Sequence, residues 1–144
     1  KVFVGNKGEY IIIKAPELQS EAILKGPVMI IPLGDDLYKV GASYGRDDYS
    51  SHTTLGACEE ISEKLSKMIS CDFRVVDQVT GIRPTVKDRK PLVGCLQNTK
   101  SVSFLNGLGT RGLTMAPQLA AHLYGYLEHD VPVPEIIDIK RFAL

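Results

Sequence analysis

Residues 28–43 read VMIIPLGDDLYKVGAS, and this stretch decides the class of fold. Two runs rich in apolar and β-branched residues, 28–33 and 37–43, flank the tripeptide Gly34-Asp35-Asp36. Glycine and aspartate tolerate the left-handed backbone conformations that a tight hairpin turn requires. The stretch therefore predicts two antiparallel strands joined by a short turn.

The segments on either side of this hairpin predict further strands. Residues 9–14 (EYIIIK) are rich in β-branched side chains and stop shortly before Pro16. Residues 72–81 (DFRVVDQVTG) have the same character. We expect Arg83-Pro84 to interrupt the ladder beyond them, because proline has no N–H group to donate.

A helix is predicted between these strands, over residues 55–69, where apolar residues recur at steps of three or four. Its apolar face comprises Leu55, Cys58, Ile61, Leu65, Met68 and Ile69. Glu60–Lys64 and Glu63–Lys67 are i,i+4 pairs in the favourable order on the polar face, which supports the helix.

The C-terminal part follows a different order. A short strand over 102–105 leads to a glycine loop over 106–112 and to a helix over 114–127. The core-facing stripe of that helix is Met115, Leu119, Leu123 and Leu127. Residues 135–142 predict a last strand. Together these segments indicate an α+β fold, mainly an antiparallel sheet with one or two packed helices, plus a C-terminal strand, glycine loop and helix.

Composition excludes several classes of function. The chain has 144 residues, 44% of them apolar and 24% charged, which is typical of a globular domain with a real core. The 17 basic and 17 acidic residues cancel, so nothing favours a nucleic-acid or membrane partner. No apolar run is long enough to span a bilayer, and no signal peptide begins the sequence.

The reactive side chains form no metal or disulfide pattern. Cys58, Cys71 and Cys95 are odd in number and widely spaced, so we expect free thiols in the cytoplasm. His52, His122 and His129 lack metal-ligand spacing. Asp88 lies in a Lys-Asp-Arg-Lys turn, where a solvated loop carboxylate is expected.

The glycine loop 107–112 matches G-x-G-x-x-G between a strand and a helix. Glycines let the backbone approach a ligand closely, and the N-terminus of the next helix stabilises anions. A dinucleotide-binding unit is rejected, because it needs a second strand where Val131-Pro132-Val133-Pro134 stands. The pattern alone leaves two interpretations open, a ligand-facing loop and a tight strand-to-helix turn.

Two motifs in combination are more specific. Residues 81–94 read GIRPTVKDRKPLVG, and residues 106–117 read NGLGTRGLTMAP. Their order resembles the C-terminal region of the FAD-dependent D-amino-acid oxidase superfamily, of the glycine oxidase and sarcosine oxidase type. Residues 7–10 and 31–43 are similar to the substrate-domain sheet of that family.

The resemblance implies roles for particular residues. Arg83 matches the family arginine that binds the substrate carboxylate beside the flavin. Thr110 stands where some relatives carry a second substrate-binding arginine, and Tyr44 is a further candidate to line the pocket. The loop facing the flavin would comprise Gly107, Leu108, Gly109, Thr110, Arg111, Gly112, Leu113 and Thr114. No residue is assigned as a general base.

The resemblance also implies a division of the chain. Residues 1–95 would be part of a substrate-binding domain, and 96–144 the C-terminal segment of an FAD-binding domain whose N-terminal Rossmann part is absent. The whole enzyme would oxidise a small-molecule amine or amino acid by hydride transfer to FAD. We expect the isolated chain to be inactive, to bind no FAD tightly, and to self-associate through uncovered apolar faces.

Two alternatives belong to other classes. The chain could be a non-catalytic interaction or regulatory domain that keeps a flavoenzyme-like fold. It could also be an autonomous mononucleotide-binding domain that uses residues 107–112.

Overall fold

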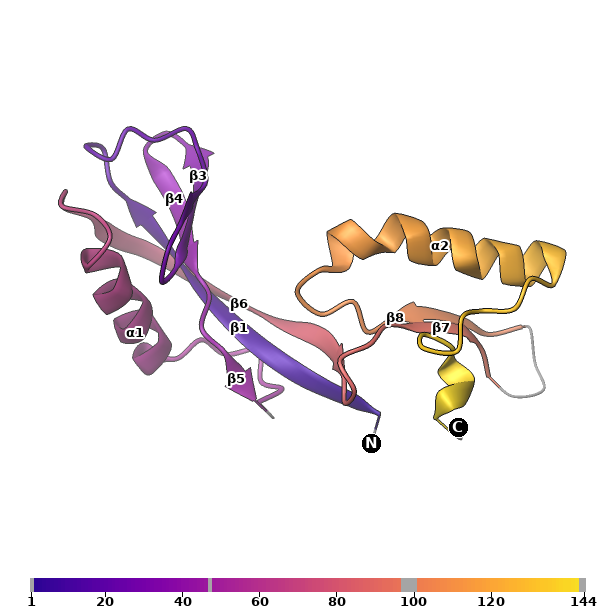
Figure 1. Cartoon of the computed structure of the whole chain (residues 1–144). Coiled ribbons are helices and arrows are strands. Elements are labelled where there is room, and N and C mark those ends of the chain that lie inside the picture. The colour runs from indigo at the N-terminus through magenta and orange to yellow at the C-terminus, as the bar shows by residue number, and fades with distance from the viewer. Residues whose placement is uncertain (1, 47, 97–100, 143–144) are drawn as a thin grey trace. The chain divides into compact units, whose positions relative to one another are not determined.

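The computed structural model describes residues 2–46, 48–96 and 101–142, and Figure 1 shows the order of their elements. The chain divides into two compact units, Lys7–Ile82 and a second unit made of Lys1–Asn6 and Arg83–Leu144. The elements are β1 Phe3–Lys14, β2 Leu24–Lys25, β3 Met29–Gly34, β4 Leu37–Gly41, β5 Gly45–Arg46, α1 Leu55–Ser66, β6 Arg74–Val86, β7 Leu92–Cys95, β8 Ser103–Asn106, α2 Gly112–His129 and the 3₁₀ helix η1 Ile139–Arg141.

An antiparallel sheet forms the Lys7–Ile82 unit. Its strand order is β2-β3-β4-β1-β5, and β6 pairs with β1. The β3–β4 hairpin is confirmed, with Ile30 opposite Val40. Asp35 and Asp36 turn the chain with φ of 53° and 61°, which is the left-handed region that the residue types of the turn predict.

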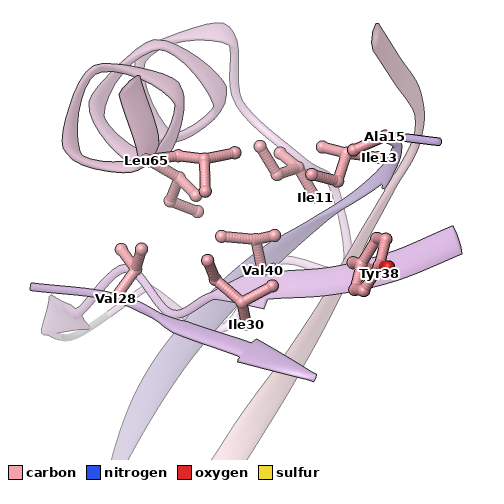
Figure 2. Packing of buried hydrophobic residues seen from close by; sticks show 9 residues of the cluster. Ile11, Ile13, Ala15, Val28, Ile30, Tyr38, Val40 and Leu65 are labelled. Atoms are coloured by element: carbon pink, nitrogen blue, oxygen red, sulfur yellow. The ribbon is translucent and has the colours of Figure 1, made fainter. Parts of the chain in front are cut away.

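One face of this sheet packs against α1. Figure 2 shows side chains of β1, β3 and β4 meeting Leu65 of α1, among them Ile11, Ile30 and Val40. These residues are at most 1% exposed. Ile61 of α1 joins the same cluster, so two turns of the helix cover the sheet.

Helix α1 is confirmed with one error in its predicted face. Leu55 is 75% exposed, whereas Ala57 is buried. The reason is the cap: Thr54 accepts a hydrogen bond from the Ala57 N–H, which places Leu55 at the first, solvent-facing position. The regular helix ends at Ser66, although the predicted residues Met68 and Ile69 still pack on the core.

The expected break at Arg83-Pro84 is wrong. Strand β6 runs through both residues and ends at Val86. Proline is tolerated in a strand on an edge, where its missing N–H group faces no partner strand. Pro84 is exposed, and in the described residues β6 pairs with β1 alone.

The second unit is built around the antiparallel pair β7–β8, in which Val93 lies opposite Leu105. Strand β7 was not anticipated. Helix α2 packs on this pair through Leu119 with Met115 and Leu123, which confirms the predicted stripe for these members.

The predicted last strand over 135–142 is wrong. The chain forms a turn over 135–137 and then η1, leaving one isolated parallel bridge between Val93 and Asp138. The cause is local hydrogen bonding. The carbonyl of Pro134 accepts from both Ile137 and Asp138, and the Asp138 side chain accepts from the Lys140 N–H.

Candidate functional site

The glycine loop joins the end of β8 to the start of α2, and two of its glycines have positive φ. Gly107 has φ +71° and Gly109 φ +55°. A Cβ at Gly107 would lie 2.5 Å from Cγ2 of Val86 and 3.2 Å from the carbonyl oxygen of Lys90. A Cβ at Gly109 would meet no described atom within 4 Å. One glycine therefore seats the loop against the protein, while the other leaves space beside the backbone.

A backbone hydrogen bond joins the two motifs that the sequence singled out. The Gly109 N–H donates to the Pro84 carbonyl over 3.1 Å. Arg83, directly before Pro84, is half-buried, and its Nη1 atom is shielded from solvent. The structure thus brings the glycine loop beside the Arg-Pro segment. Because the Gly109 N–H already donates to Pro84, other N–H groups of the loop or helix would have to donate to a ligand.

Those N–H groups are at the start of α2. Its N-cap residue is Arg111, which makes no side-chain capping hydrogen bond. The first N–H groups of a helix have no partner within it, and they carry a partial positive charge. No acidic residue lies in the first turn of α2. Gly112, Leu113 and Thr114 therefore present donors suited to an electron-rich ligand edge.

The remaining predicted residues lie at the surface. Thr110, Arg111 and Thr114 are exposed, and Leu113 is 97% exposed. Tyr44 lies between β4 and β5 in the Lys7–Ile82 unit and is 69% exposed. The roles of these residues in binding stay predictions.

A buried polar network on β1 was missed by the sequence reasoning. Lys7 is 1% exposed and Glu9 4% exposed. The Lys7 ammonium contacts Asp48 at 2.8 Å, Ser50 at 3.0 Å and Glu9 at 3.5 Å. A signal existed, because Lys7 and Glu9 share the strand face of the core residues that follow at every second position.

Glu9 ties three segments of this unit together. Its carboxylate accepts from the Thr54 N–H at 2.7 Å, from the Thr54 hydroxyl at 3.0 Å and from Nε2 of Gln78 at 2.9 Å. The start of α1 and the middle of β6 are therefore both fastened to β1 through one side chain.

Hydrogen bonding keeps the Lys7–Asp48 pair charged. The Lys7 ammonium, with help from the backbone and hydroxyl of Ser50, lowers the pKa of Asp48 to about 2. The same hydrogen bond to Asp48 raises the pKa of Lys7. The pair is thus ionised throughout the neutral range, which suits a structural rather than a proton-transferring role.

Asp88 is more than a solvated loop residue. Its carboxylate accepts from Nε of Arg141 at 2.8 Å and from Nη2 at 3.3 Å. This two-point contact lowers the pKa of Asp88. Sequence could not pair the two residues, because they stand far apart in the chain.

Two absences concern the described residues only. No helix within 2–46, 48–96 and 101–142 is long and apolar enough to cross a bilayer. In the same ranges no three His, Cys, Asp or Glu side chains cluster so as to hold a metal ion.

Comparison with known proteins gives consistent matches. A family model described as FAD dependent oxidoreductase matches residues 2–125. Glycine oxidase of Bacillus subtilis (strain 168) is 25% identical over 122 residues, which cover 83% of this chain and 33% of the relative. The chain therefore spans about a third of the length of that relative.

Solved structures share the fold. Glycine oxidase from Geobacillus kaustophilus superposes with a TM-score of 0.74 at 18% identity, over 95% of this chain and 39% of its own. Iminodiacetate oxidase from Chelativorans sp. BNC1 gives a TM-score of 0.72 at 21% identity, over 95% and 40%.

Proposed function

Because the chain belongs to the FAD dependent oxidoreductase family, we propose that it is the C-terminal part of an enzyme that oxidises an amine or amino acid. FAD is the cofactor of this family. The observation that carries the proposal is the hydrogen bond from Gly109 to Pro84, which joins both family-like motifs in one place. The amine class is supported by the names of similar proteins, glycine oxidase and iminodiacetate oxidase.

The residues at the start of α2 fit one edge of a flavin ring. Gly112, Leu113 and Thr114 present N–H donors without intrahelical partners, and space lies beside Gly109. When bound, FAD supplies the acceptor for a hydride and its two electrons. The positive end of α2 would favour negative charge at the ring edge that it faces.

The substrate side of the proposed site is built on Arg83. A guanidinium pairs with a carboxylate through two parallel hydrogen bonds, so it fixes the direction of the carbon that carries the amine. Because Arg83 sits in β6 and is half-buried, the strand restricts its orientation. Thr110 of the same unit would add a hydroxyl contact. The protein thus orients and binds, and no side chain is assigned to move a proton.

The proposal includes the division at residue 95 into a partial substrate-binding domain and a segment of the FAD-binding domain. The share of the relatives that the chain covers supports its being part of a longer enzyme, whereas the compact units of the structure divide between Ile82 and Arg83. Leu113 and Tyr124 of α2 are 97% and 61% exposed, which suits a face that another part of the enzyme covers. Alone, the chain would be inactive and would self-associate.

The three cysteines are free thiols. This supports the cytoplasm as the compartment in which the enzyme works, because free thiols persist in reducing surroundings.

Flavin reduction tests the proposal. The complete protein that carries this chain is mixed anaerobically with a panel of amines and amino acids, and the bleaching of the flavin absorbance is followed. Arg83→Ala should lower the second-order rate constant of flavin reduction by the substrate roughly 100-fold. This is the loss expected when a charge-assisted pair worth about 3 kcal/mol is removed. The matched control is Lys87→Ala, which removes an exposed cation nearby and should change little.

Two outcomes would contradict the proposed oxidoreductase activity. A protein that holds FAD but is reduced by no amine, with Arg83→Ala unchanged in every assay, would favour an interaction or regulatory domain. Saturable binding of AMP by the isolated chain would favour the mononucleotide-binding alternative.

A further inference from the structure

We propose that Arg141 is a positioning residue for the proposed flavin site. It holds the turn over residues 87–91 against the glycine loop and so maintains the contact between Gly109 and Pro84. This inference rests on the proposed function for its meaning, although its central claim concerns geometry within the second unit alone.

The guanidinium of Arg141 makes four hydrogen bonds. Nε and Nη2 bind the two carboxylate oxygens of Asp88 at 2.8 and 3.3 Å. Nη2 also binds the carbonyl of Lys90 at 3.1 Å, and Nη1 binds the carbonyl of Asp138 at 2.9 Å. The Arg141 side chain is only 16% exposed, so solvent screens these contacts less than on an open surface. One side chain thereby clasps the turn to η1.

Apart from Arg141, the clasped turn is held by its own hydrogen bonds and by one from the Lys87 N–H to the Val2 carbonyl at 3.0 Å. Arg89 occupies it with φ +61°, a conformation that is unfavourable for a residue with a side chain. The turn is closed by the Arg89 N–H on the Val86 carbonyl at 2.8 Å and by the Lys90 N–H on Asp88 at 3.0 Å. Asp88 therefore stabilises the turn by a hydrogen bond within it, and Arg141 stabilises it by hydrogen bonds from η1.

The glycine loop packs against this turn at Gly107. The three atoms nearest to a Cβ built at Gly107 belong to Val86, Lys90 and Pro91. Two residues later, Gly109 donates to Pro84 on the strand that leads into the turn. A shift of the turn would therefore move the surface under Gly107 and the carbonyl that receives Gly109.

The apolar contacts of η1 cannot replace the clasp. Ile139 packs with Val86 and Leu92, so it anchors the two ends of the turn region. The residues between them, 87–90, are exposed. Only the polar contacts of Arg141 reach from η1 to the middle of the turn among the described residues.

Amide hydrogen exchange in the complete protein tests the clasp without FAD or substrate. Arg141→Ala and Asp88→Asn should each speed exchange of the Gly109 amide roughly tenfold, while the amides that donate between β7 and β8 keep their rates. Lys140→Ala is the matched control on η1, since the Lys140 ammonium contacts the hydroxyl and ring of Tyr126 and not the turn. It should change neither the Gly109 rate nor the rates of the ladder amides. Arg141→Lys, which keeps the charge but loses the fork, should give an intermediate rate even if Arg141→Ala unfolds.

Equal acceleration across the whole second unit would reduce Arg141 to a general stabiliser and overturn the proposal. An unchanged Gly109 amide would do the same. In the active enzyme, Arg141→Ala should raise the KM for the substrate roughly tenfold and leave kcat nearly intact, because Arg83 would be displaced rather than removed. If no substrate is found but the exchange pattern holds, the clasp stands and the proposed function fails.

Discussion

A methyl group placed on two glycines of the same loop should have very different consequences. Gly107→Ala and Gly109→Ala each put a side chain at positive φ, +71° and +55° respectively. That conformation costs an alanine about 1–2 kcal/mol. The two sites share this term, so any difference between the variants comes from what the added methyl group meets.

The difference follows from the surroundings of each Cβ. At Gly107 it would lie 2.5 Å from Cγ2 of Val86, a β-branched side chain that is 1% exposed and has no room to move. Overpacking of this kind adds about 1–3 kcal/mol. At Gly109 nothing lies within 4 Å. We expect a loss of about 2–5 kcal/mol for Gly107→Ala and about 1–2 kcal/mol for Gly109→Ala.

Urea denaturation followed by circular dichroism measures both values. The reasoning would be refuted if the two variants lost the same stability, or if Gly109→Ala lost more. For FAD binding by the complete protein, the order of the two variants should reverse, with the larger loss in Gly109→Ala. Gly109→Ala should weaken FAD binding beyond its small effect on stability, because its methyl group occupies the space assigned to the ring.

Three further predictions concern the Lys7–Ile82 unit. Glu9→Ala should lower the free energy of unfolding by about 2–4 kcal/mol, measured in urea, because it removes three accepted hydrogen bonds beside a buried ammonium. The Asp48–Lys7 pair should stabilise the fold fully above the ordinary aspartate pKa and be lost as the pH falls through about 2, so acid titration of Asp48→Asn should show a flatter stability curve. Leu65→Ala should cost about 2–5 kcal/mol by thermal or urea denaturation, whereas exposed Leu55→Ala should stay within about 0.5 kcal/mol.

Local chemistry made much of the fold predictable from sequence. The turn residues Asp35 and Asp36 specify a hairpin because few other residues accept their φ values. The helix over 55–66 shows its period because only one face is buried. The motifs around Arg83 and Gly109 were singled out by their resemblance to a known family, and in the structure a backbone hydrogen bond joins them.

Features that depend on tertiary context were not predictable. Pro84 lacks an N–H group, so it prevents strand pairing only on the side to which that group would point. The sequence does not tell which side of β6 is a free edge. Residues 135–142 have strand-like composition, but the carbonyl of Pro134 and the side chain of Asp138 offer the backbone local partners instead. The buried ion pair of β1 was missed because charge normally marks a solvent-facing position.

Thr54 has a second consequence, which concerns the order of events as the chain folds. Its hydroxyl caps α1 at 3.3 Å from the Ala57 nitrogen while donating to a carboxylate on β1 that stands 45 residues earlier. A nascent helix can form its internal ladder alone, but its first turn gains this second bond only after β1 has docked. Fraying of that turn should therefore report on the docking of β1.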